Sequence, residues 1–332
     1  MSYNSMISRG TGPSYSATPG THPLIPEEVS REVLKAIPEK SIVLEMFKKR
    51  TMSTAQQRMP MLASKPTAFW VNGDTGLKQT TSMAWTNKFL DAEEIATIVA
   101  IPEKLLDDAD YDIWGEIKPE IVEAMAIALD EAVLFGYNKP SSWPAAIVVA
   151  AIAAGNVVVQ GAGVDVAADV NSVMATVEAD GYEVNGFFIR QSMKAQFRGL
   201  RDTQNGLIFQ PAPSVSKSTW TGDIWGVKAV TNRSGLFEQE DAGTYGRASQ
   251  SIKMIAGDFT QGIIGVRQDV TWKMLDQAVI SDADGNIVFN LPQQDMVALR
   301  CVARYAFQVP NPYNRIQTNE ANRYPFGVLR DA

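Results

Sequence analysis

Residues 101–136 read IPEKLLDDADYDIWGEIKPEIVEAMAIALDEAVLFG. The second half of this stretch predicts one long helix, because apolar side chains recur at three- and four-residue spacing and therefore share a face: Ile117, Ile121, Met125, Ala128, Leu129 and Ala132. Carboxylates take much of the remaining helix surface: Glu116, Glu120, Glu123, Asp130 and Glu131. Asp112 suits the N-cap and Gly136 suits the C-terminal stop. Pro119 leaves two alternatives, a regular helix that begins there or a helix that kinks at the proline.

The composition is that of a soluble globular protein. The chain has 332 residues, of which 45% are hydrophobic and 20% charged, so it can bury a sizeable core. The net charge of −7 argues against a free-standing nucleic-acid-binding domain, which is usually basic. The charge is uneven, because residues 1–58 carry +3 and the remainder carries −10.

The chemistry-bearing residues are too few for the common catalytic and metal sites. Cys301 is the single cysteine and lies in an apolar run, so we expect a core residue and no internal disulfide. His22 is the single histidine, which leaves no residues for a histidine or cysteine metal site or a Ser-His-Asp triad. The apolar tract at residues 145–159 is too short to span a bilayer. We therefore predict no active site, no cofactor and no membrane partner.

The N-terminal region predicts an arm rather than a domain. Residues 1–24 are rich in Ser, Thr, Gly and Pro and have little that could form a core. Residues 25–50 predict a short amphipathic helix followed by the basic cluster Lys48, Lys49 and Arg50. This cluster is either a solvated charge run or a contact for a polyanion.

Residues 56–100 predict long β ribbons. A short strand is expected at residues 59–62, and Asn72-Gly73 is a strong tight-turn signal followed by a polar tip at residues 75–82. Residues 89–102 then predict one strand that leads into the long helix. Extended polar arms of this kind usually contact neighbouring molecules.

Residues 138–300 predict a more compact α/β region. A helix is expected within residues 164–182 and a short basic helix within 192–202. Asp284-Gly285 marks a hairpin turn. Strands are expected at residues 186–190, 224–230, 251–256, 262–267, 270–275 and 297–309.

The order of these stretches resembles the major capsid proteins of tailed bacteriophages, which have the Hong Kong 97-type fold. Residues 101–136 resemble that family's spine helix, and AFWVNGDTGLKQTTSMAW, residues 68–85, falls where the family has its extended loop. The resemblance continues through GFFIRQSMKAQFRGLRDTQNGLIFQP, GDIWGVKAVTNRSG and IAGDFTQGIIGVRQDVTWKML, and ends with MVALRCVARYAFQVPNPYNRI. It covers roughly residues 25–317.

The resemblance implies an α+β fold in five parts. These are an N-terminal arm (1–55), an extended β-hairpin loop (56–92), a peripheral domain with the spine helix (93–137, completed by part of 250–317), an axial domain (138–300, with peripheral strands inserted) and a closing strand with a C-terminal tail (301–332). Copies would form the hexamers and pentamers of an icosahedral shell around nonspecifically bound double-stranded DNA. Further partners would be a portal, a separate scaffolding protein and an optional decoration protein. The chain would be a structural virion protein, not an enzyme, assembled in the host bacterial cytoplasm.

The resemblance also assigns contact residues. The loop would contact the next copy through Trp70, Asn72, Gly73, Asp74, Lys78 and Trp85. DNA-facing or arm contacts would come from Arg31, Lys48, Lys49 and Arg50. Some family members crosslink a loop lysine to an asparagine of a neighbour. Lys78 lies in the matching loop, and Asn311 or Asn314 could be its partner, but no motif fixes the asparagine, so ordinary polar lattice contacts are the favoured explanation of Lys78.

Two other interpretations stay open. An encapsulin, a bacterial nanocompartment shell protein of the same fold, would package a cargo enzyme, but it usually begins with a helix rather than a long polar arm. An α/β enzyme that uses carboxylates would need a converging pocket, which the sequence does not indicate.

Overall fold

The computed structural model describes residues 40–71, 73, 76–108, 112–161, 165–200, 220–231, 236–237, 252–282 and 284–331. These residues belong to one unit of the chain, Ile37–Ala332. The arm and amphipathic helix expected within residues 1–39, including Arg31, lie outside the described residues, as do Asn72 and Asp74.

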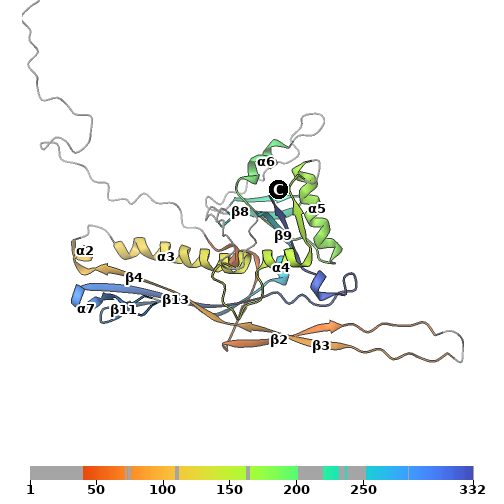
Figure 1. Ribbon diagram of the computed structural model, residues 1–332, viewed down its shortest axis with the longest axis horizontal. Helices are drawn as coiled ribbons and strands as arrows, with labels where there is room; N and C mark the ends of the chain where they lie inside the picture. The colour runs from red at the N-terminus through yellow and green to blue at the C-terminus, as the bar shows by residue number, and fades with distance from the viewer. Residues whose placement is uncertain are drawn as a thin grey trace, which may run out of the picture. The chain divides into compact units, whose positions relative to one another are not determined.

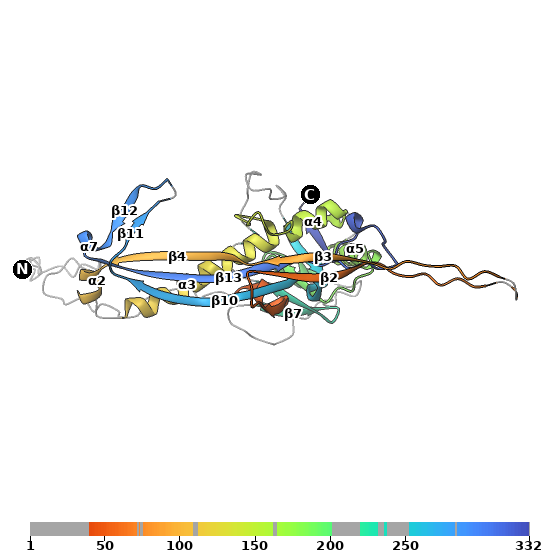
Figure 2. The ribbon, with the colours of Figure 1, turned by 90° about the horizontal axis from the view of Figure 1, so that it is seen from below.

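A four-stranded sheet carries the long helix (Figures 1 and 2). Its strands lie in the order β1 (Lys48–Thr51), β10 (Ile263–Leu275), β13 (Met296–Gln308) and β4 (Glu93–Pro102). Helix α3 (Ile113–Asp130) packs against this sheet, and the Sδ of Met125 lies 3.1 Å from the Sγ of Cys301. Cys301 is fully buried, which confirms its predicted place in the core.

Both predicted ends of the long helix are confirmed. Asp112 is the N-cap of α3, which continues into a π-helical turn, η1 (Glu131–Phe135). Gly136 ends this turn with φ +84°, a left-handed conformation that glycine adopts at little cost. The alternative that the helix begins at Pro119 is wrong, because α3 starts six residues earlier. Pro119 therefore lies inside α3, between the buried side chains of Ile113 and Ile121.

The prediction of the exposed helix face was wrong at three positions. Asp130 is 1% exposed and Glu131 is also buried, whereas Ala128, placed on the apolar face, is exposed. For Asp130 the reason is a second partner, the short helix α1 (Ile42–Met46). The Asp130 carboxylate accepts hydrogen bonds from three donors at the start of α1, at 2.5, 2.9 and 3.2 Å: Ser41 Oγ, the N–H of Ile42 and the N–H of Val43. Periodicity within one helix does not reveal such a long-range partner.

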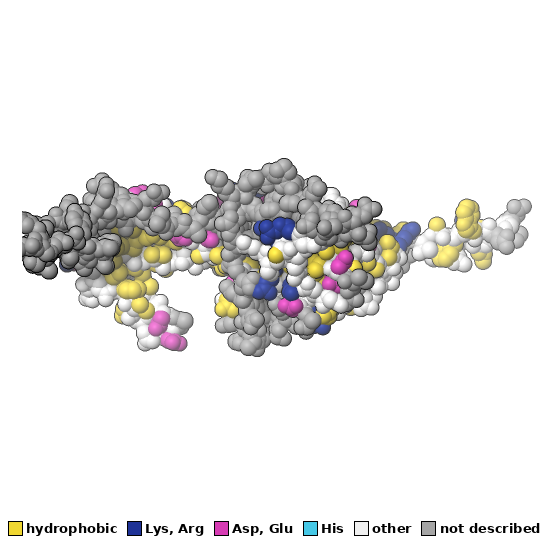
Figure 3. All heavy atoms as spheres, turned by 90° about the horizontal axis from the view of Figure 1, so that it is seen from above, with side chains coloured by type: hydrophobic (Ala, Val, Ile, Leu, Met, Phe, Trp, Pro, Cys, Tyr) yellow, Lys and Arg dark blue, Asp and Glu magenta, His cyan; other side chains and the backbone are white. Residues whose placement is uncertain are grey.

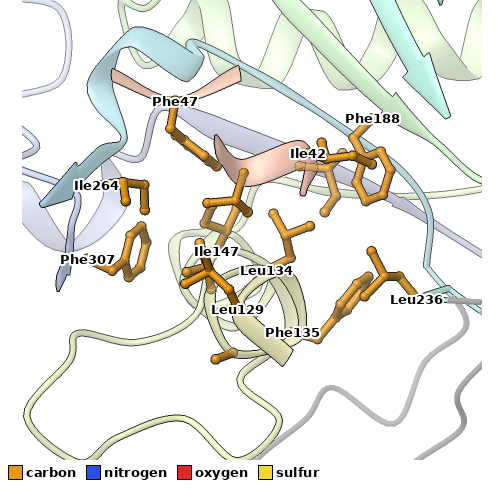
Figure 4. Packing of buried hydrophobic residues seen from close by; sticks show 14 of the residues in the cluster. Ile42, Phe47, Leu129, Leu134, Phe135, Ile147, Phe188, Leu236, Ile264 and Phe307 are labelled. Atoms are coloured by element: carbon orange, nitrogen blue, oxygen red, sulfur yellow. The ribbon is translucent and has the colours of Figure 1, made fainter. Parts of the chain in front are cut away.

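The second large sheet of the fold has six strands. Its order is β5 (Val157–Val159), β14 (Phe326–Arg330), β9 (Ile252–Gly257), β6 (Gly186–Ile189), β8 (Val227–Thr231) and β7 (Trp220–Ile224). Helices α5 (Val166–Ala179) and α6 (Met193–Gly199) pack with Phe187 and Ile189 of β6. The intervening Phe188 faces the other way, into a core that it shares with α3 and α4 (Ile147–Ala154). Figure 4 shows this shared core, in which Phe188 lies beside Ile42 of α1, and Leu129 and Ile147 belong to the same cluster.

Three predictions of where strands begin and end were wrong. Residues 224–230 form a hairpin between β7 and β8, because Trp225 and Gly226 both have positive φ and turn the chain. Residues 262–267 and 270–275 belong to the single strand β10, which absorbs register shifts against β13 rather than breaking. Residues 89–102 divide at Ala92 into the end of β3 (Ala84–Asp91) and β4, which belong to different sheets.

The remaining elements are short. The predicted turn at Asp284-Gly285 joins β11 (Val279–Ser281) to β12 (Ile287–Asn290). The other short elements are α2 (Glu103–Asp108), η2 (Phe259–Gln261), α7 (Leu291–Gln294) and η3 (Glu320–Asn322). In the described part of the chain, no helix combines the length and the apolar content needed to cross a membrane.

Candidate assembly surfaces

The extended loop, defined here as residues 65–83, projects from a two-stranded ribbon. Strand β2 (Gln56–Ser64) pairs antiparallel with β3, and the ladder ends at the pair Ser64 and Ala84. The described residues between these ends adopt no regular strand. Figures 1 and 2 show the two arms of the loop continuing beyond the ribbon. The strand predicted at residues 59–62 is therefore confirmed, and Gly73 has the positive φ of +74° that a tight turn needs.

Large apolar side chains of the loop lie in solvent. Trp70 has 103% of the exposure of a reference tryptophan, and Leu77 has 91%. Figure 3 shows hydrophobic side chains, in yellow, along this projection. The other exposed large apolar side chains of the loop and ribbon are Phe69, Val71, Met83, Trp85 and Phe89. A monomeric protein rarely exposes so many large apolar side chains on one segment, so this loop has the character of a contact surface for another protein.

The basic cluster lies apart from the loop, on an edge strand. Lys48, Lys49 and Arg50 form most of β1, and all three side chains are exposed. β1 pairs with β10 on one side only, so it is an edge of the four-stranded sheet. Charged side chains on such an edge discourage unwanted strand pairing and at the same time offer cations to a phosphate backbone.

The two asparagines considered as crosslink partners are engaged within the subunit. Asn311 is buried, and its side-chain oxygen accepts hydrogen bonds from Tyr182 Oη at 2.8 Å and Arg323 Nε at 2.9 Å. The Asn314 amide donates to the carbonyl of Asp180 at 2.6 Å. A bond from Lys78 of another copy would have to break these interactions, so polar contact is the better-supported role for the exposed Lys78.

A cleft of about 570 Å³ lies beside the root of the ribbon. Lys88 of β3, Tyr324, and Pro144 and Ala145, which precede α4, contribute to its walls. Among the described residues, no group of three or more His, Cys, Asp or Glu side chains is placed to hold a metal ion.

Sequence reasoning missed two exposed apolar sites. Trp225, at the tip of the β7–β8 hairpin, is 55% exposed with φ +52°. The β11–β12 hairpin exposes Val279, Ile287 and Val288. The turn at residues 284–285 predicted the second hairpin, but alternation alone gave no reason to treat its apolar side chains as a contact surface.

The chain matches known phage proteins over most of its length. Residues 22–316 match the model of the phage capsid family. The chain is 26% identical over 287 residues to the major capsid protein of Staphylococcus phage 80alpha, which covers 85% of this chain and 80% of the relative. It is 24% identical over 285 residues to the probable major capsid protein gp17 of Mycobacterium phage D29, covering 84% and 85% respectively.

Solved structures from phages have the same fold. The structure from Microbacterium phage Oxtober96 superimposes with a TM-score of 0.77 at 35% identity and covers 93% of this chain and 97% of its own. The structure from Mycobacterium phage Cain also gives 0.77, at 32% identity, covering 93% and 96%. These matches confirm the α+β, Hong Kong 97-like fold and do not favour the encapsulin alternative. The chain belongs to the phage capsid family and is a major capsid protein.

Proposed function

We propose that copies of this chain form the hexamers and pentamers of an icosahedral shell around the double-stranded DNA of a tailed phage, and that the extended loop joins neighbouring copies. The observation that carries the loop's role is the full exposure of Trp70 and Leu77 on a segment that forms no ladder of its own. Such side chains gain little within the subunit. Burial against another copy would remove their apolar surface from water.

The five-part division of the chain is part of this proposal. The four-stranded sheet with α3 suits the peripheral domain, whose strands come from residues 48–51, 93–102, 263–275 and 296–308. The six-stranded sheet with α5 and α6 suits the axial domain. β2 and β3 suit the extended loop's ribbon. The closing strand is then β13, which pairs with both β10 and β4.

The exposed cations Lys48, Lys49 and Arg50 suit contact with DNA phosphate. The remainder of the chain is acidic, which limits binding strength and suits nonspecific contact with a genome that must later leave. A portal, a separate scaffolding protein and an optional decoration protein complete the proposed partners. Assembly takes place in the host cytoplasm, and the chain has a structural rather than an enzymatic role.

The test is to replace residues 65–83 by a two-residue Asn-Gly turn, which suits a ladder that ends at Ser64 and Ala84. We expect a folded subunit, with the melting temperature of the unaltered chain, that forms no closed shells. Negative-stain electron microscopy and analytical ultracentrifugation measure assembly, and circular dichroism controls for folding. Intact shells from the shortened chain would remove the loop from the lattice and overturn the proposal.

A further inference from the structure

The C-terminal segment 308–323, called here the C-terminal brace, holds the root of the extended loop from both sides. Two contacts reach the β2 side, where the N–H of Tyr313 donates to Leu62 O at 3.1 Å and Arg315 Nη2 donates to Pro66 O at 3.1 Å. Two more reach β3: Gln308 Nε2 donates to Phe89 O at 2.9 Å, and Lys88 Nζ lies 2.8 Å from Glu320 Oε1. The Arg315 contact lies two residues beyond the last ladder pair, on the loop itself.

Arg323 fixes the shape of the brace from within. This side chain is 3% exposed and donates to Asn311 Oδ1 at 2.9 Å, Asn311 O at 3.1 Å and Gln317 O at 2.7 Å. Asn311 itself has φ +51°, a conformation that needs support from its surroundings. The inner part of the brace, around Arg323 and Asn311, is therefore a buried hydrogen-bonded cluster. Its outer part contacts the loop.

We propose that the C-terminal brace sets the direction of the extended loop and thereby determines where the loop meets the next copy. A two-stranded ribbon alone is marginally stable, so β2 and β3 need outside support to keep one orientation. An arm of nine extended residues reaches about 30 Å, and a 10° rotation at its root displaces the tip by about 5 Å. Such a displacement separates side chains that must touch.

The outer and inner contacts of the brace have different energetic roles. The side chains of Lys88 and Glu320 are 32% and 53% exposed, and such an ion pair contributes little to the stability of a subunit. Arg315 is likewise exposed. Loss of the Arg315 and Lys88–Glu320 contacts therefore leaves the fold intact and weakens the hold on the loop, while the hydrogen bonds of Tyr313 and Gln308 remain. Loss of buried Arg323 leaves several carbonyl groups without a donor and destabilises the subunit itself.

The experiment measures loop direction in the isolated subunit and assembly in the same variants. Cysteines introduced by Thr80→Cys on the loop and Ser172→Cys on α5 accept donor and acceptor dyes, and native Cys301 is buried and stays unlabelled. For Arg315→Ala and Glu320→Lys we expect unchanged melting temperatures, a broader distance distribution and a shell yield reduced at least several-fold. Lys88→Glu combined with Glu320→Lys restores the opposite charges, so we expect it to recover both readouts.

Each alternative outcome is decisive. The proposal that the brace sets the direction of the loop is refuted if the distance distribution of Glu320→Lys stays as narrow as that of the unaltered chain. It is also refuted if Glu320→Lys loses shells and the double variant Lys88→Glu with Glu320→Lys does not restore them. The inference rests on the proposed role of the loop, and the two can fail separately. If the chain with residues 65–83 replaced still forms shells, the loop proposal fails. If that chain does not assemble but the brace variants do, only the brace is overturned.

Discussion

Trp70→Ser tests the contact between the loop and the next copy at a side chain that is fully exposed in the subunit. A buried tryptophan removes about 150–250 Å² from water, and at about 25 cal/mol per Å² this corresponds to roughly 4–6 kcal/mol. Ordering of the side chain and incomplete burial reduce the loss to roughly 2–4 kcal/mol per loop, in the range of interface hot spots. Since each subunit has one such loop, the protein concentration needed for assembly should rise about 30- to 1,000-fold.

Light scattering across a concentration series measures this threshold, and electron microscopy identifies the products. The unassembled subunit should melt within about 2 °C of the unaltered chain, because exposed Trp70 has little surface to lose on substitution. Trp225→Ser, which removes another exposed indole from a different sheet, is the matched control. An unchanged threshold in Trp70→Ser, or an equal rise in both variants, would refute the loop-specific role of Trp70.

Three further predictions concern Asp130, Trp225 and the basic cluster of β1. Burial raises the pKa of Asp130 to about 7, above its ordinary 3.8, so its contribution to stability is complete below pH 4 and is lost as the pH rises through 7. The free energy of unfolding of the unaltered chain minus that of Asp130→Asn should therefore fall from about pH 4 to about pH 7 in denaturant titrations and level off above that; a constant difference would contradict this. Trp225→Asn should stabilise the subunit by about 1 kcal/mol, because φ +52° in a two-residue turn suits asparagine, and a lower melting temperature would count against the strain. Reversing the charges of Lys48, Lys49 and Arg50 should reduce packaged DNA, measured as the ratio of full to empty particles, while normal filling would end their proposed DNA role.

Local signals in the sequence predicted individual elements well. Asp112 and Gly136 mark the ends of the long helix as predicted; Gly136 adopts the left-handed φ that favours glycine, whereas the Asp112 side chain makes no capping hydrogen bond. The buried strand at residues 186–189 follows from a short apolar run. Local signals could not predict the tertiary contacts between segments that are distant in the sequence. Asp130 is buried because it meets the start of α1, nearly ninety residues earlier.

The loop shows the same division between local pattern and tertiary contact. Asn72-Gly73 and the polar tip predicted an extended hairpin, and Trp70, Lys78 and Trp85 were named as contact residues from the family resemblance. Their exposure agrees with that role, which the proposed variants now test. The brace could not be predicted, because its hydrogen bonds join residues 62–89 to residues 308–320 largely through backbone carbonyls, which leave no signature in side-chain patterns.

The most direct measurement of the lattice role is a cryo-electron microscopy map of the shell that the purified chain forms, alone or with a candidate scaffolding protein. We expect closed particles in which the indole of Trp70 lies buried against a second copy, with the Lys88–Glu320 contact retained at the root of the loop. Closed shells in which Trp70 remains in solvent would contradict the role of the extended loop in joining the subunits.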